Sequence, residues 1–135
     1  MKQQTLTDKE RNQLVAYRLQ RAKDTLLEAD NLINNNFYNA AINRLYYACY
    51  YAVIALLIKY NISAQTHQGV KNMLSLHFVA SGKINKQQAI FYSRLFNDRI
   101  SCDYDDFVQY NHEMITLIRP QAETFISAIE MEIMK

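Results

Sequence analysis

The chain has 135 residues, of which 50% are hydrophobic and 21% charged, and we expect one globular domain spanning residues 1–135. Two glycines and one proline are too few for the repeated tight turns of a β-sandwich or barrel, so the composition favours an all-α fold. The formal net charge of +2 excludes the strongly basic proteins that coat nucleic acids through bulk charge.

Motifs for metals, cofactors and export are absent from the sequence. Cys49 and Cys102 form no CxxC pair, which favours reduced thiols in a cytoplasmic protein. Residues 1–5 are polar and no apolar segment follows them, so we expect no secretory signal. The sequence contains no HExxH, ExxH, P-loop or GxGxxG pattern, and we therefore expect neither a metal nor a cofactor.

Capping signals and apolar periodicity predict two long helices in the first 60 residues. Thr7 and Glu10 have the spacing of a capping box, apolar residues recur every three or four positions from Val15 to Ile33, and three asparagines follow. The second helix covers about residues 37–60, and its stretch 45–58 has tyrosines as its only polar side chains. This stretch is shorter than the roughly 20 residues that span a bilayer, so we expect no membrane association and a central position in a bundle. Burial is the expected state of its tyrosines, Tyr46, Tyr47, Tyr50 and Tyr51.

Three further helices are predicted after residue 68. A short one carries His77 on its apolar face, where we expect a core histidine, and ends at Ser81-Gly82. Asn85 opens a fourth helix that runs to about Ser101, and an acidic corner follows at residues 103–106. The last helix contains Pro120, which predicts a kink or a break. The elements together predict a five-helix, mostly up-and-down antiparallel bundle.

Charge is distributed unevenly along the chain. Residues 1–30 carry a net charge of +1, residues 31–102 carry +6, and residues 103–135 carry −5. One interpretation is internal: the acidic last helix packs beside the basic third and fourth helices. The other is a phosphate-binding surface. Its candidate residues are Lys71, Lys83, Lys86, Arg94 and Arg99.

Four fragments, in order and covering nearly all of the chain, resemble the HEPN domain superfamily: AINRLYYA at 41–48, THQGV at 66–70, HFV at 77–79 with Gly82, and SRLFNDR at 93–99 followed by DYDD at 103–106. More narrowly, the chain resembles stand-alone bacterial and archaeal HEPN proteins whose genes often accompany a minimal nucleotidyltransferase. The resemblance implies a helical bundle, frequent homodimerisation and links to RNA or nucleotides. In many members it also implies metal-independent RNase activity, toxin-antitoxin pairing and host defence.

Catalytic members of that superfamily carry an arginine followed four to six residues later by a histidine. The arginine stabilises the charged transition state, and the histidine, with an ordinary pKa of about 6.5, transfers protons near neutrality. The matching positions here are Arg99 and Asp103, with Tyr104 beside them, so the histidine is missing. A carboxylate is ionised at neutral pH and cannot act as the general acid. We interpret Arg99 and Asp103 chiefly as a structural ion pair.

These residues leave three functional hypotheses. The leading one is a dimeric HEPN-type module without efficient catalysis that binds RNA, a nucleotide or a nucleotidyltransferase partner. The second is an RNase that keeps Arg99 and recruits His67, Tyr104 or Asp103 in the second role. His67 is predicted at the start of the third helix, where the helix dipole favours neutral imidazole and a loop-anchoring hydrogen bond is expected. The third hypothesis is a pure protein-interaction scaffold.

Overall fold

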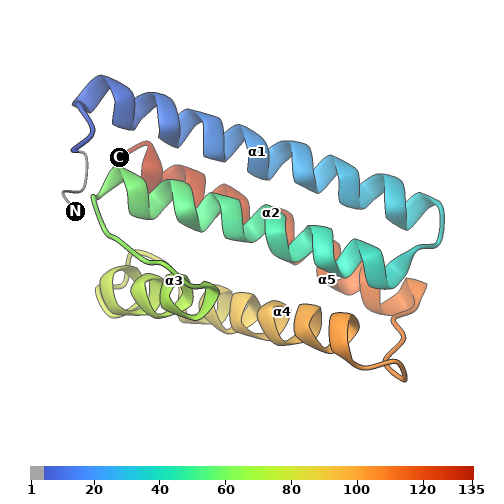
Figure 1. Ribbon diagram of the computed structural model, residues 1–135. Coiled ribbons are helices and arrows are strands. Elements are labelled where there is room, and N and C mark those ends of the chain that lie inside the picture. Colours follow the sequence, from blue (N-terminus) through green and yellow to red (C-terminus); the bar gives the residue numbers. More distant parts are fainter. Residues whose placement is uncertain (1–4) are drawn as a thin grey trace.

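The computed structural model describes residues 5–135, and this part of the chain is all-α, with five α-helices and no strand (Figure 1). Residues 1–4, which hold most of the polar start that predicts no secretory signal, lie outside the described residues. The helices are α1 (Asp8–Asn34), α2 (Tyr38–Lys59), α3 (His67–Leu74), α4 (Lys86–Tyr104) and α5 (His112–Ile133). A π-helical turn, η1 (Ser75–Val79), continues α3. The predicted fold class is confirmed.

Helix α2 lies at the centre of the bundle, as its uniformly apolar stretch predicts. It packs against α1, α3, α4 and α5, and α1 runs beside it over most of its length (Figure 1). Four small residues of α2 are fully buried, which allows close approach of neighbouring helices: Ala41, Ala48, Ala52 and Ala55. By length and composition α2 is able to cross a membrane, but 61% of its most apolar window is buried inside the bundle. That burial is the pattern of a core helix.

The capping residues of the sequence form the predicted helix ends. The Thr7 hydroxyl accepts a hydrogen bond from the Glu10 amide at 3.1 Å, and the Glu10 carboxylate accepts one from the Thr7 amide at 2.9 Å. Asn85 caps α4 through the Gln87 amide. Gly82, just beyond η1, has a φ of 77°, which a side chain would disfavour.

The structure corrects the expected position of His77. Its side chain is exposed rather than in the core, while Phe78 is only 2% exposed. The amide of Ala80 donates to the carbonyl of Ser75, five residues earlier, which adds one residue to this turn. The extra residue shifts the buried face, so a helical period of 3.6 assigns the wrong residue to the core.

Three other details differ from the predictions. Helix α4 continues three residues beyond Ser101, so Asp103 lies within its last turn. Helix α5 continues through Pro120, so the alternative of a break there is wrong. Of the α2 tyrosines only Tyr46 is fully buried; the others, Tyr47, Tyr50 and Tyr51, are half-buried.

Helix α5 forms its ion pairs with other helices only to α1 among residues 5–135, and not to the basic helices α3 and α4. Lys23 contacts Glu130 at 2.7 Å, and Arg119 contacts Asp30 at 2.8 Å. No ion pair among residues 5–135 joins α5 to α3 or α4. The internal interpretation is therefore wrong in its electrostatic part: α5 packs against α4, but among residues 5–135 it forms no ion pair with the cations of α3 and α4.

The core of the bundle depends on aromatic packing between α4 and α5. Phe125 is fully buried and stacks on Tyr92, with ring centroids 5.2 Å apart. We expect Phe125→Ala to lower the free energy of unfolding by about 3–5 kcal/mol, measured by urea denaturation, because it leaves a cavity. Phe107, which is 96% exposed, supplies the control, and Phe107→Ala should change stability by less than about 0.5 kcal/mol. Equal losses of stability in Phe125→Ala and Phe107→Ala would contradict the role of Phe125 in the core.

Candidate functional site

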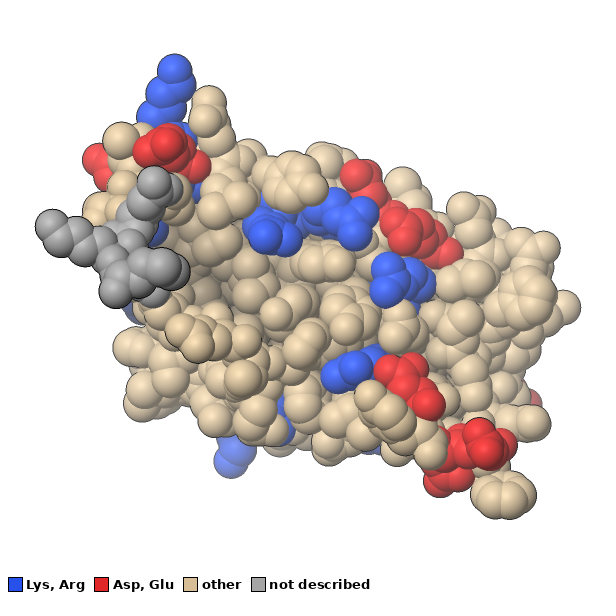
Figure 2. Space-filling model, viewed as in Figure 1, with Lys and Arg blue, Asp and Glu red and all other residues tan. Residues whose placement is uncertain are grey.

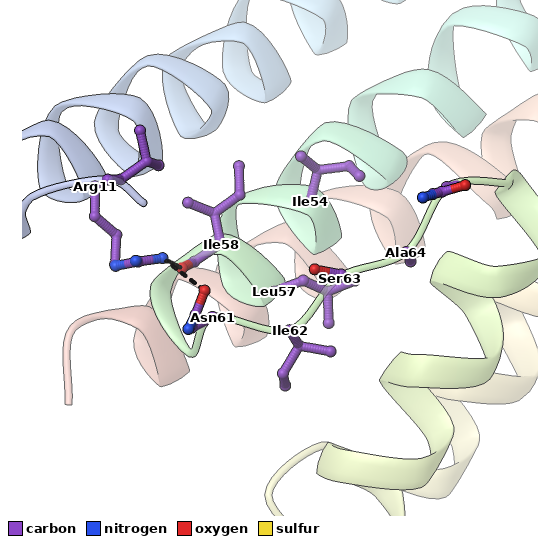
Figure 3. Close-up of a pocket in the computed structure, with 10 residues that line it drawn as sticks. Arg11, Ile54, Leu57, Ile58, Asn61, Ile62, Ser63 and Ala64 are labelled. Carbon is purple, nitrogen blue, oxygen red and sulfur yellow. Dashed lines mark hydrogen bonds between the residues drawn. The ribbon is translucent and has the colours of Figure 1, made fainter. Parts of the chain in front are cut away.

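The loop between α2 and α3 is anchored by Arg11 of α1. Its guanidinium donates to the Ile58 carbonyl at 3.0 Å and to the Asn61 side chain at 3.4 Å (Figure 3). These contacts satisfy a carbonyl at the C-terminal end of α2. They lie at the edge of a cavity of about 330 Å³ that is lined mainly by aliphatic side chains of α2 and the loop. The loop leads directly to Thr66, whose hydroxyl accepts from the Gly69 amide at 2.8 Å and starts α3.

His67, the first residue of α3, is held against the tyrosines of α2. Its Nδ1 lies 2.7 Å from the Tyr46 hydroxyl, and its ring stacks on Tyr50 with centroids 4.3 Å apart. Burial raises the pKa of Tyr46, so its hydroxyl keeps its proton and we assign it as the donor to Nδ1. Nε2 then carries the imidazole hydrogen. The expected loop-anchoring hydrogen bond is present.

The imidazole of His67 is biased toward its neutral form. Burial lowers the pKa of His67, and the positive charge of Arg99 lowers it further. At neutral pH the ring therefore presents an N–H donor at Nε2 without a charge. Arg99 of α4 packs on the ring of the same Tyr46, so the fold brings this arginine close to a histidine 32 positions earlier in the chain.

Arg99 of α4 packs against two tyrosines of α2 and one phenylalanine of its own helix. Its guanidinium carbon is 5.0 Å from the ring centroid of Tyr46, 5.8 Å from that of Tyr47 and 6.0 Å from that of Phe96. The expected contact with Asp103 is present, with Nη1 and Oδ2 3.4 Å apart. The Arg99 side chain is 14% exposed, and its Nε is buried without a hydrogen-bond acceptor among residues 5–135. Its hydrogen-bonding capacity is therefore only partly used by the protein.

Of two further candidate residues, Tyr104 and Lys71, only Lys71 lies close to the groups that Arg99 contacts. Tyr104 is 82% exposed on the last turn of α4. Lys71 is close, because its Nζ lies 4.9 Å from the ring centroid of Phe96, which Arg99 also contacts, and 3.5 Å from the Ser93 hydroxyl.

Three basic candidates lie elsewhere. Lys83 packs against Tyr60, 5.5 Å from its ring centroid, and Lys86 is exposed at the first residue of α4. Arg94 is exposed beside Asp98 in a groove of about 340 Å³ between α4 and α5. The predicted phosphate-binding set is thus divided: Lys71 and Arg99 share one surface, and Arg94 lines another.

Tyr46 and Tyr47 also belong to this site, although the sequence pattern predicts only that they are buried. A tyrosine hydroxyl in an otherwise apolar helix needs a polar partner, and that requirement is the signal in the sequence that points to a site. Arg44 was also missed. Its guanidinium lies 5.1 Å from the Tyr47 ring centroid, on the ring that Arg99 also contacts.

The arrangement can bind an anion. It combines an incompletely paired guanidinium, a neutral imidazole N–H and a nearby ammonium group, held on aromatic rings that limit their motion. Among residues 5–135 no group of three or more histidine, cysteine or acidic side chains could hold a metal ion. Asp103 competes for the guanidinium, so an anion that binds here has to displace or outweigh that carboxylate.

Comparisons with known proteins place the chain in a family. The model of the HEPN domain matches residues 15–132. The chain belongs to the HEPN domain family. It is similar to a UPF0332 protein of Thermotoga maritima, with 36% identity over 90% of this chain and 92% of that protein. It is also similar to two Methanocaldococcus jannaschii proteins named "Putative toxin". One is 31% identical over 81% of each chain, and the other is 27% identical over 81% of this chain and 74% of that protein.

The depressed pKa of His67 predicts a specific pH dependence of stability. Above about pH 6.5, the ordinary pKa of histidine, the ring is neutral in both states and contributes nothing. As the pH falls below that value the unfolded chain binds the proton more readily than the folded HEPN domain, in which burial and Arg99 disfavour it. We therefore expect the folded state to lose stability there, until the pH passes the lower pKa of the folded state.

Denaturant titrations of wild type and His67→Gln between about pH 5 and 7 test this expectation. Glutamine can still accept a hydrogen bond from Tyr46 but does not titrate, so the variant should lose less stability over this range. His112→Gln, at an exposed histidine that begins α5, is the control and should follow the wild type. Parallel profiles for wild type and His67→Gln would contradict the prediction.

Proposed function

We propose that this chain is a toxin-like HEPN module that binds RNA through a phosphate at Arg99 and cleaves it inefficiently or not at all. The proposal rests on the contacts of the Arg99 guanidinium, which is held on Tyr46 and Tyr47 and, among residues 5–135, pairs with a single carboxylate at 3.4 Å. Family membership and relatives named "Putative toxin" support an RNase-related or toxin-like role.

The chemistry at position 103 supports binding over efficient cleavage. Catalytic HEPN proteins use a histidine beyond the arginine, whereas this chain has Asp103 one helical turn after Arg99. A carboxylate there cannot donate a proton at neutral pH and repels a phosphate. The RNA would therefore be held by the guanidinium without the usual proton donor next to it.

The proposal includes the expected partners. We propose a homodimer in the cytoplasm that associates with a minimal nucleotidyltransferase or with RNA, in keeping with the HEPN proteins that this chain resembles. Size-exclusion chromatography with light scattering, and a pull-down from the native host analysed for protein and nucleic acid, would test these partners. A strict monomer with no RNA affinity and no co-purifying partner would contradict the proposal.

Removing the charge of Arg99 should weaken RNA binding. We expect Arg99→Gln to reduce affinity for a single-stranded RNA and to lower the slope of log K against log salt by about 0.7, the value for one phosphate contact. Fluorescence anisotropy between about 50 and 200 mM salt measures both quantities. Arg94→Gln is the matched control, because it removes an exposed arginine of the same helix from the groove on the α5 side.

Two outcomes decide this test. Equal affinities for wild type and Arg99→Gln would end the proposal, and a wild type that binds no RNA would favour the protein-interaction scaffold. Asp103→Asn provides a gain-of-function variant, since it removes the carboxylate that competes for Arg99. RNA affinity should increase in that variant and should fall again when Arg99→Gln is added.

A second candidate function is a metal-independent RNase in which His67 replaces the missing histidine. The observation in its favour is that Tyr46 contacts both side chains, through its hydroxyl to His67 and through its ring to Arg99. The imidazole of His67, whose neutral form burial and the charge of Arg99 favour, can exchange a proton near neutral pH. Neither Tyr104 nor Asp103 offers such a group.

Cleavage of a mixed RNA in EDTA tests this candidate. If His67 is the acid or base, His67→Gln and Arg99→Ala should each slow cleavage by about 100-fold or more. The exposed His112 provides the control, and His112→Gln should cleave at the wild-type rate. Equal rates for wild type and His67→Gln would rule out this role for His67 and leave the binding proposal in place.

A further inference from the structure

A row of arginine–tyrosine contacts extends from the Arg99 site across α2 to α1. Arg44 packs over Tyr47 at 5.1 Å, and Arg21 packs over Tyr51 at 5.0 Å from guanidinium carbon to ring centroid. Arg21 also lies 3.5 Å from the Tyr51 hydroxyl, and this hydrogen bond is the main reason that the pKa of Arg21 is raised. We call this region the arginine–tyrosine surface. It comprises Tyr17, Arg18, Arg21, Arg44, Tyr47, Tyr50 and Tyr51.

The surface is continuous with the site around His67. The His67 ring stacks on Tyr50 at 4.3 Å, Tyr50 lies 5.9 Å from Tyr51, and Tyr51 lies beneath Arg21. Burial raises the pKa of Tyr50, and the charge of Arg18, which packs over Tyr17, opposes that increase. Figure 2 shows basic atoms on both sides of a surface between α1 and α4 that carries few charges.

The arginines of α1 on this surface are not neutralised. Neither Arg18 nor Arg21 forms an ion pair with a carboxylate of residues 5–135. Lys23 of the same helix contrasts with them, because it pairs with Glu130 at 2.7 Å. Contact with a tyrosine face orients a guanidinium but leaves its charge and its outward N–H groups available.

We propose that Arg18 and Arg21 bind a second phosphate position of the strand that Arg99 holds, so that the ligand is a single-stranded RNA of several nucleotides and not a mononucleotide. This inference rests on the proposed function. Arginine forks recognise phosphate oxygens in a planar, bidentate geometry. The tyrosines between the two arginine groups offer aromatic surface to unpaired bases, which a duplex does not present. Tyr17, which is 57% exposed beneath Arg18, extends that aromatic surface.

The length of the RNA provides the first test. Uridine monophosphate and oligouridylates of increasing length serve as probes, with anisotropy or competition as the measurement. A ligand that reaches only Arg99 gains nothing from Arg18 and Arg21, so affinity should rise with length until both positions are occupied. Affinity for the monophosphate that equals affinity for the longest oligouridylate would overturn the inference while leaving the role of Arg99 intact.

Charge removal provides the second test. The double variant Arg18→Gln/Arg21→Gln should lower the salt slope for the long oligouridylate by about 1.4, or about 0.7 for each single variant. Its affinity for the monophosphate should not change. Lys23→Gln is the control, since it removes one positive charge from α1 at a residue paired with α5, and its slope should match the wild type.

These experiments distinguish failure of this inference from failure of the proposed function. If Arg99→Gln weakens RNA binding but the double variant behaves like Lys23→Gln, this inference fails and the proposed function stands. If neither set of variants changes the binding, both fail. Should the double variant not fold, the single variants decide, together with Tyr51→Leu, which should reduce affinity without changing the slope because Arg21 keeps its charge. Displacement of the RNA by polyglutamate at equal charge concentration would reassign the surface to an acidic protein partner and overturn the inference.

Discussion

The buried Tyr46 of α2 contacts functional candidates on two other helices. Its hydroxyl holds His67 at the start of α3, and its ring face supports Arg99 of α4. Tyr46 itself is fully buried in the central helix, so its position is set by the packing of the whole bundle. A hydroxyl buried without a partner would cost about 1–3 kcal/mol, which gives the bundle a reason to retain the histidine contact. Tyr46 thus helps to hold both the start of α3 and the guanidinium of α4 in the site.

Local signals in the sequence predict the bundle well because they act over three or four residues. The capping box at Thr7 and Glu10 and the apolar stretch of α2 need no tertiary information. The proximity of His67 to Arg99 does need tertiary information, because the loop anchored by Arg11 affects where the first turn of α3 lies in the bundle. Periodicity fails at His77 for a related reason, since the π-helical turn inserts a residue that no local pattern announces.

The division of the basic residues also depends on tertiary structure. Composition shows a positive middle segment but not which cations find carboxylates. In the bundle Glu130 of α5 pairs with Lys23 of α1, and Arg119 of α5 pairs with Asp30 of α1. Neither pair involves Arg18 or Arg21, and Arg21 packs on Tyr51 of α2 instead. A near-neutral protein can therefore keep a local positive surface, because Coulomb interactions are screened within about 10 Å at ordinary salt.

Typical interaction free energies indicate whether Asp103 or a phosphate binds Arg99 more strongly. An exposed i, i+4 ion pair contributes about 0.3–0.5 kcal/mol. The Arg99 to Asp103 pair is long at 3.4 Å, and its carboxylate is 33% exposed, although the Arg99 side chain is only 14% exposed. A phosphate that reaches the same guanidinium makes a charge-assisted contact, and hydrogen bonds to charged groups are worth about 1.5–3 kcal/mol. Repulsion from Asp103 subtracts from this value but is weakened by its exposure to water. Asp103 therefore competes only weakly with a phosphate for the Arg99 guanidinium. It nevertheless impairs catalysis, because phosphate binding at this position needs only the charge of Arg99, whereas cleavage also needs a group that can transfer a proton.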